Sequence, residues 1–102
     1  MSAEAFEKLA RGFLDDPDVS TGRMFGSEGL KINGKVFAMN VKGDLVVKLP
    51  AGRCSSLVEQ GHARPFDPGH GRLMKEWVAV PPERARDWRC LAEEARAFVG
   101  GA

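Results

Sequence analysis

The sequence has little of several features that would place a protein in a specialised class. No apolar run approaches the roughly 20 residues that a membrane-spanning helix needs, so we expect no membrane association. Its two cysteines, Cys54 and Cys90, are too few for a disulfide scaffold, and we expect both to be reduced. The formal charge is only +1, from 15 basic and 14 acidic side chains, so the composition does not indicate a strongly basic surface for duplex nucleic acid.

The N-terminus also lacks the uninterrupted apolar stretch of a secretory signal, because Glu4 and Glu7 lie within it. A cytoplasmic protein is therefore expected. What the sequence does contain is ordinary for a globular chain, with 43% hydrophobic and 28% charged residues. A length of 102 residues fits a single domain that covers positions 1–102.

Three segments show the apolar spacing of three and four residues that is typical of an amphipathic helix. The first covers residues 2–14 and ends at Asp15-Asp16-Pro17, because a residue that precedes proline is disfavoured in helical geometry. The second begins at Pro50, and Gly61 is suited to end it. The third begins at Pro82 and continues to the glycines near the C-terminus.

Between the first two helices the apolar residues alternate with a period of two, which predicts strands. Asn33-Gly34 is a strong signal for a two-residue hairpin turn. Such a turn places Ile32 opposite Lys35 and Leu30 opposite Phe37. One face of the sheet is then expected to carry Leu30, Ile32, Phe37, Met39 and Val41.

The next turn allows two registers. A two-residue loop, Lys42-Gly43, would pair Val41 with Asp44 and turn the apolar residues of the following strand away from Met39. A three-residue loop that includes Asp44 would pair Met39 with Val47 and keep the apolar residues of both strands on one face. Because a slip of one residue exchanges the two faces of a strand, the pattern favours the three-residue loop.

Two further strands are predicted after the second helix, a short edge strand near residues 64–67 and a strand over residues 75–80. Trp77 and Trp88 are expected to join the last strand to the last helix in the core, or else to lie at an interface. The element order α-β-β-β-α-β-β-α predicts an α+β fold, a two-layer sandwich in which helices cover one face of a mostly antiparallel sheet of about five strands.

Three segments together resemble the N-terminal domain of TfoX-type proteins: Arg23-Met24-Phe25-Gly26-Ser27-Glu28-Gly29-Leu30, Asn33-Gly34-Lys35-Val36-Phe37-Ala38 and Leu45-Val46-Val47-Lys48. Later segments follow in the matching order, so the resemblance covers nearly the whole chain. The family signature consists of Met24, Phe25, Gly26, Gly29, Gly34 and Phe37. The resemblance implies a secretion-chaperone-like α+β arrangement and a regulatory or protein-interaction module. Longer TfoX proteins regulate competence for DNA uptake and carry a second, C-terminal domain.

The glycine-rich part of this signature, residues 24–29, has two interpretations. As an anion cradle it would expose consecutive backbone amides, but it lacks the dinucleotide-binding spacing and the lysine of a phosphate loop. A tight bend is favoured, in which glycines adopt unusual dihedrals while Met24 and Phe25 anchor in the core. The signature residues are therefore expected to be structural.

Residues of the types that bind metals or catalyse reactions are present but poorly spaced. Four of them could supply sulfur and nitrogen ligands to zinc: Cys54, His62, His70 and Cys90. The nearest two are eight positions apart, whereas structural zinc sites use close pairs, so no metal and no cofactor is expected. A serine triad drawn from Ser55 or Ser56, His62 and Asp67 lacks a strained turn for the nucleophile. We therefore expect no catalytic residues and no enzymatic activity.

Basic residues gather on the last helix and in one loop. The helix residues Arg84, Arg86, Arg89 and Arg96 are matched by four acidic residues, and Arg89 has ion-pair spacing to Glu93, so a self-neutralised surface is expected there. The candidate contacts for an anionic ligand or a partner are therefore Arg64, His70, Arg72 and Lys75, in and beside a glycine-rich loop.

The leading hypothesis is a non-enzymatic regulatory or protein-interaction module whose partner is another protein or a second copy of itself. A homodimer would seal an uncovered sheet edge or an exposed aromatic side chain. The alternatives are a nucleic-acid-binding regulator related to competence and a small enzyme accessory.

Overall fold

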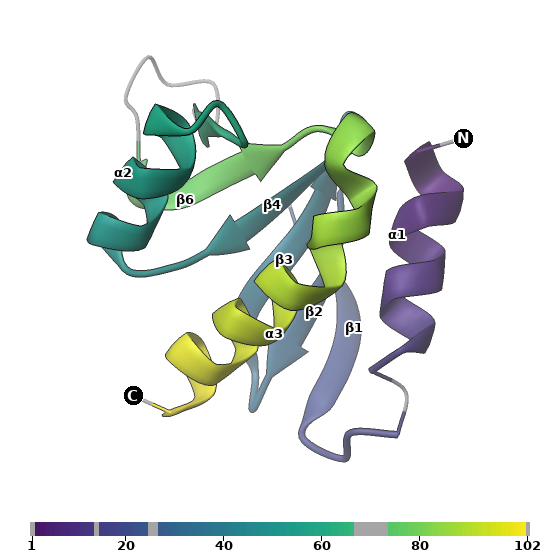
Figure 1. Cartoon of the computed structure of the whole chain (residues 1–102). Coiled ribbons are helices and arrows are strands. Elements are labelled where there is room, and N and C mark those ends of the chain that lie inside the picture. The colour runs from purple at the N-terminus through teal and green to yellow at the C-terminus, as the bar shows by residue number, and fades with distance from the viewer. Residues whose placement is uncertain (1, 14, 25–26, 67–73, 102) are drawn as a thin grey trace.

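The computed structural model describes residues 2–13, 15–24, 27–66 and 74–101 (Figure 1). Its helices are α1 (Ser2–Arg11), α2 (Ala51–Glu59) and α3 (Ala85–Gly101), the last preceded by a short 3-10 helix, η1 (Pro82–Arg84). Its strands are β1 (Val19–Met24), β2 (Ser27–Ile32), β3 (Lys35–Val41), β4 (Asp44–Lys48), β5 (Arg64–Phe66) and β6 (Met74–Val80).

The strands form one sheet in the order β1-β2-β3-β4-β6-β5, in which every neighbouring pair is antiparallel. All three helices lie on the same face of this sheet (Figure 1). Helix α3 crosses the central strands, α2 packs against β5 and β6, and α1 lies beside α3 (Figure 1). The predicted α+β class and two-layer arrangement are confirmed.

The sheet has six strands, one more than the sequence pattern predicts. The additional strand is β1, which pairs with β2 from Val19 opposite Ile32 to Met24 opposite Ser27. Among its described side chains only Val19 packs against the core, while Ser20 and Thr21 are exposed. An edge strand of this kind shows no apolar alternation, because backbone pairing to its neighbour rather than side-chain burial holds it in place.

The main core lies between the sheet and the helices, and its largest fully buried side chains are Trp88 and Phe37. The apolar positions predicted for the helices supply it, among them Phe6, Leu9, Cys54, Leu57, Leu91, Ala92, Ala95 and Val99. Trp88 therefore joins α3 to the core as predicted. The same prediction for Trp77 is wrong, because Val78 and Val80 take the helix-covered side of β6 and alternation turns Trp77 to the other side.

The turns that join β2 to β3 and β3 to β4 each have two residues in the left-handed region, with φ of 51° and 83° at Asn33 and Gly34 and of 52° and 88° at Lys42 and Gly43. This is the conformation of a type I′ turn, whose twist matches that of the strands it joins. The predicted turn at Asn33-Gly34 is confirmed, with Ile32 opposite Lys35. The predicted three-residue loop through Asp44 is wrong, because Val41 pairs with Asp44.

A β-bulge in β3 explains why the predicted register fails. Lys31 lies opposite Val36, but Leu30 lies opposite Ala38, so Phe37 is an extra residue in its strand. Phe37 and Ala38 both enter the main core with no exposed surface, and the alternation is reversed after them.

The bulge corrects two predictions about the faces of the sheet. Leu30 does not pair with Phe37, and Met39 and Val41 lie on the opposite face from it. With β3 reversed in this way, the two-residue loop keeps Leu45 and Val47 on the helix-covered face, as apolar burial requires.

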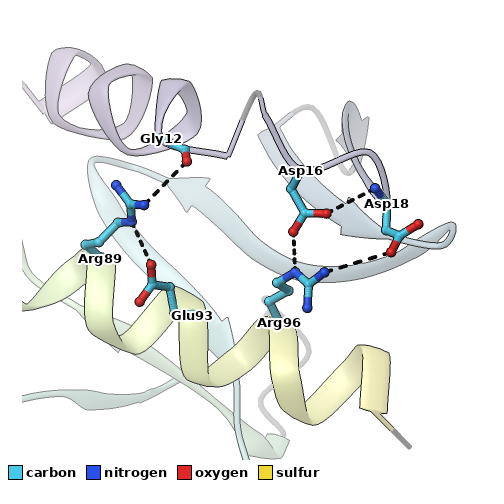
Figure 2. Close-up of polar contacts among 6 residues, drawn as sticks. All are labelled: Gly12, Asp16, Asp18, Arg89, Glu93 and Arg96. Carbon is cyan, nitrogen blue, oxygen red and sulfur yellow. Dashed lines mark hydrogen bonds and ion pairs between the residues drawn. The ribbon is translucent and has the colours of Figure 1, made fainter.

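Polar contacts fasten the end of α1 and the following turn to α3 (Figure 2). The side chain of Arg96 donates from Nε to the Asp16 carboxylate, which also accepts the Asp18 amide at 3.1 Å. Arg89 forms the predicted ion pair with Glu93 at 2.9 Å, and its Nη2 donates to the carbonyl of Gly12 at 3.4 Å. The predicted neutralisation within the helix therefore holds for Arg89, whereas Arg96 is neutralised by the segment that follows α1.

The ion pair between Arg96 and Asp16 predicts a stability that depends on pH. The hydrogen bond from Arg96, with the Asp18 amide, holds the pKa of Asp16 below its ordinary value of 3.8. A carboxyl whose pKa is lowered on folding stabilises the protein above its ordinary pKa, and that contribution is lost as the pH falls through the lowered value. Asp16→Asn is therefore expected to melt at a lower temperature than the wild type at pH 7, and the difference should shrink as the pH falls below 3.8, through the lowered pKa of Asp16. Thermal denaturation by circular dichroism measures this, and the exposed neighbour, changed in Asp15→Asn, is the matched control. A deficit that persisted at low pH would contradict the ionic explanation.

Candidate interaction surface

The sheet face opposite the helices, here termed the open face, has an apolar cluster of its own. Met39, Val46 and Ala79 are at most 5% exposed, and four partly buried side chains pack around them: Val36, Val41, Phe66 and Trp77. All of these residues belong to strands, and no helix within residues 2–13, 15–24, 27–66 and 74–101 contributes to the cluster. Along β3, β4 and β6, apolar side chains point to both faces of the sheet. The helices cover only one of these faces, so the apolar residues on the other face form the second cluster.

The register of the strands aligns the centre of the open face in a single row. Gly29 lies opposite Met39, Met39 opposite Val46, and Val46 opposite Ala79, which in turn lies opposite Arg64. These five residues, termed the middle row, cross β2, β3, β4, β6 and β5 in order. The three members at its centre are apolar and buried, so the apolar surface that remains exposed on this face belongs to the partly buried residues packed against them.

Charged side chains flank the middle row differently on its two sides. On one side lie Lys31, opposite Val36, and Lys48, opposite Trp77. The side chain of Lys31 lies over Gly22 of β1. Its Cε is 3.1 Å from the position that a Cβ on Gly22 would occupy. On the other side of the row the carboxylate of Asp44 forms an ion pair with Arg64. One flank is therefore cationic, and the other is neutralised by its own ion pair.

Three of the six signature residues have a defined place in the sheet. Gly34 is the second turn residue, Gly29 belongs to the middle row, and Phe37 is the bulged core residue. The ring of Phe37 packs edge-on against Phe13, with 5.6 Å between the centroids. Met24 ends β1, whereas Phe25 and Gly26 lie outside the described residues, as does the bend predicted there.

The predicted contacts for an anionic ligand are only partly described. Arg64 lies in the edge strand β5, as predicted for this segment, and its guanidinium is engaged by Asp44 on the open face. Lys75 is a residue of β6. His70 and Arg72 lie outside the described residues, as does Asp67 of the serine triad.

A groove of about 240 Å³ between α2 and α3 brings together two members of the candidate zinc set, His62 and Cys90. Cys54 lies apart from them, and its buried thiol donates to the carbonyl of Leu49 at 3.5 Å. Burial raises the pKa of the Cys54 thiol, which favours the protonated form that does not bind metals. Among the residues that the structure describes, no group of three metal-binding side chains is present.

The charges of this groove are already paired. Arg53 is bonded to Glu94 at 2.9 Å, and Arg84 is bonded to Asp87 at 2.8 Å. An anion that entered the groove would have to compete with these carboxylates. The open face is therefore the better candidate for a binding surface.

Sequence reasoning identified Met39 as a buried residue but did not find the surface around it. No motif marks Lys31, Lys48 or Val36 as a surface contact. A regular alternation of faces along β3 would also place Met39 on the face that the helices cover. The available signal is the Lys42-Gly43 pair, since a glycine-containing two-residue turn is compatible with the apolar pattern only if β3 contains a bulge.

A family model described as the TfoX N-terminal domain matches residues 10–100. None of the curated proteins compared with the chain matches it. Across the described part of the chain, the helices are too short or too polar to cross a membrane.

Proposed function

Because this chain belongs to the TfoX N-terminal domain family, we propose that it is a non-enzymatic, regulatory protein-interaction module whose partner binds on the open face of the sheet. The observation that supports this proposal is the second apolar cluster, Met39, Val46 and Ala79, on the face that no described helix covers. Strand positions that face only water are ordinarily polar, as in sheets with one solvated face.

The distribution of charge gives less support to the alternative of a nucleic-acid-binding regulator. Four arginines of α2, η1 and α3, namely Arg53, Arg84, Arg89 and Arg96, are bonded to carboxylates within the chain. Phosphate binding depends on cations that can replace counterions on the nucleic acid, and a paired arginine contributes less to this. The role of an enzyme accessory is not favoured by any feature of the described residues.

We place the module in the cytoplasm, and the cysteines support this location. Both Cys54 and Cys90 are free thiols, and Cys90 is exposed. Exposed free thiols persist in reducing compartments and are oxidised in secreted proteins.

Site-specific photo-cross-linking tests the proposed surface. A benzoyl-phenylalanine at Val36, which is partly buried at the edge of the open-face cluster, should cross-link to a protein in a lysate of the source cells. The same group at Arg86, an exposed position at the start of α3, is the matched control and should give no such product. Mass spectrometry would identify the product, including a second copy of this chain. If both positions gave the same products, or neither gave any, the open face would not be the binding surface.

A further inference from the structure

The two edges of the sheet differ in how well they are protected against pairing with another strand. The sheet ends at β5 on one side and at β1 on the other. Strand β5 has three residues, contains Pro65, which has no amide hydrogen to donate, and has an irregular register at that residue. Strand β1 has six residues, none of them proline, and pairs with β2 without a register shift. Of the two edges, β1 is therefore the one suited to accept a further strand.

The outer side of β1 is accessible from both faces of the sheet. Thr21 lies opposite Leu30 and so points to the helix side, whereas Ser20 points to the open face, and both side chains are exposed. Because Thr21 is exposed on the side where the helices lie, no helix of the described residues covers the middle of this strand. In the described part of the chain, β2 is the strand that pairs with β1, and the other side of β1 has no partner.

The backbone of β1 shows which residues point outward. The amide of Val19 donates to the carbonyl of Asp16 at 3.2 Å, so it is not used in pairing with β2. In an antiparallel ladder, residues whose amide and carbonyl groups point away from the neighbouring strand alternate with residues whose groups face it. Thr21 is two residues after Val19, so its amide and carbonyl also point outward. These two groups can pair with a strand added at this edge.

The position of Lys31 distinguishes two registers in which β1 of a second copy would overlap this strand almost fully. Its side chain lies over Gly22, with Nζ 3.4 Å from the position that a Cβ there would occupy. A register with Gly22 opposite its own copy would bring the two ammonium groups together, which is unfavourable for like charges. A register with Thr21 opposite its own copy separates them along the strands. It also places Gly22 opposite Ser20 of the second copy, whose hydroxyl can accept a hydrogen bond from Lys31.

We propose that β1 pairs with β1 of a second copy of this chain, antiparallel and about a two-fold axis at Thr21. The two sheets then form one continuous sheet whose remaining edges are the two copies of β5. Because β5 is short and contains Pro65, assembly ends at the dimer and does not continue into a filament.

A strand of another protein fits this edge less well than a second copy. In strand addition the specificity comes from pockets that receive alternate side chains of the added strand. The middle of β1 consists of Ser20, Thr21 and Gly22, whose small side chains do not form such pockets. This inference does not rest on the proposed function, since the edge of β1 is separate from the apolar cluster of the open face.

A charge exchange at the two-fold axis tests the dimer. In Thr21→Lys two ammonium groups would lie opposite each other, and in Thr21→Glu two carboxylates would. Each variant alone is therefore expected to raise the dissociation constant of the dimer on the order of tenfold or more over the wild type. An equimolar mixture of the two variants should dimerise again, because lysine then lies opposite glutamate. Sedimentation equilibrium measures all of these dissociation constants.

Two further sets of variants separate the edge of β1 from other effects of substitution. Ser55→Lys and Ser55→Glu change an exposed residue of α2 and are the matched controls, which should dimerise like the wild type. Thr21→Pro removes an outward amide that β2 does not use, so it should keep the native circular dichroism spectrum. It should also raise the dissociation constant on the order of tenfold, since each dimer loses two hydrogen bonds.

The register is tested with a mixture of isotope-labelled and unlabelled protein. A nuclear Overhauser contact is expected between the α hydrogens of Ser20 in one copy and Gly22 in the other. Opposite residues of a pair that is not hydrogen-bonded lie closest in an antiparallel ladder, and these two residues form such a pair in the proposed register.

Each contrary result overturns the inference. A wild type that sediments as a monomer up to its solubility limit would leave the edge to a strand of another protein. A dimer that Thr21→Lys leaves unchanged, or a mixture of the lysine and glutamate variants that stays monomeric, would place the contact elsewhere on the molecule. A contact between Ser20 of one copy and Met24 of the other would assign the register that pairs Gly22 with itself, and the axis would not lie at Thr21.

Discussion

Trp88→Ala is expected to lower the free energy of unfolding by about 3–5 kcal/mol, the range for removal of a large buried aromatic side chain. Trp88 is 1% exposed, and its Nε1 donates to the carbonyl of Pro81 at 3.3 Å. The substitution would leave a cavity where α3 meets the sheet and would also remove the partner of that carbonyl. A domain of this size has a total stability of about 5–15 kcal/mol, so the variant would be marginally folded.

The other tryptophan provides the matched control for this prediction. Trp77 lies on the open face and is only partly buried, so Trp77→Ala should cost less than about 1.5 kcal/mol. Urea denaturation followed by circular dichroism measures both losses, with Trp88→Phe as a milder change at the buried site. Equal losses from the two alanine variants would contradict the assignment of the two tryptophans to different faces.

Deletion of Phe37 is expected to leave the register of the sheet unchanged and to lower the free energy of unfolding by about 3–5 kcal/mol, the range for removal of a large buried aromatic side chain. The deletion would remove the bulge, and Ala38 would follow Val36 directly, so that Val36 still lies opposite Lys31 and Ala38 still lies opposite Leu30, each on its present face. The main core would lose a side chain that has no exposed surface and that packs edge-on against Phe13. The register of β4, set by the Lys42-Gly43 turn, would stay compatible with that of β2.

The control for this deletion keeps the number of residues unchanged. Phe37→Leu retains the bulge and most of the buried apolar surface, while it loses the edge-on contact with Phe13. A loss of about 1–2 kcal/mol with a native-like spectrum is expected for this substitution. Two-dimensional ¹H–¹⁵N spectra show whether each variant is folded, because an unfolded chain gives poorly dispersed amide signals. Nuclear Overhauser contacts between Met39 and the helices in the deletion variant would contradict the expected retention of the register.

The helices were predictable because each carries its own periodic signal. Phe6 and Leu9 in α1, or Leu91, Ala92 and Ala95 in α3, recur at the spacing that places them on one side of a helix, and all of them are buried. The turn at Asn33-Gly34 was predictable for the same reason, since both residues tolerate the positive φ that a type I′ turn requires. Signals of this kind lie within a short segment, so they can be recognised without knowledge of how the rest of the chain folds.

The candidate surface was not predictable in the same way. The open face depends on which of two apolar sets in β3, β4 and β6 the helices cover, and both sets contain valines and other large apolar residues. Alternation by itself shows that Trp77 and Val78 lie on opposite faces of the sheet. It does not show which of these faces the helices cover. The flank formed by Lys31 and Lys48 emerges only when β2 and β4 are placed on either side of β3.

The sequence by itself determined the helices, the first hairpin turn, the family and the α+β class, because each of these follows from residue spacing or from motifs within a short stretch of chain. Only the tertiary structure decided the register beyond Phe37, the pairing of β1 and the composition of the two sheet faces. The physical reason is that one extra residue in a strand costs little locally but reverses every side chain after it. Whether that reversal is favourable depends on the burial of residues such as Leu45 and Val47 against helices distant in the sequence.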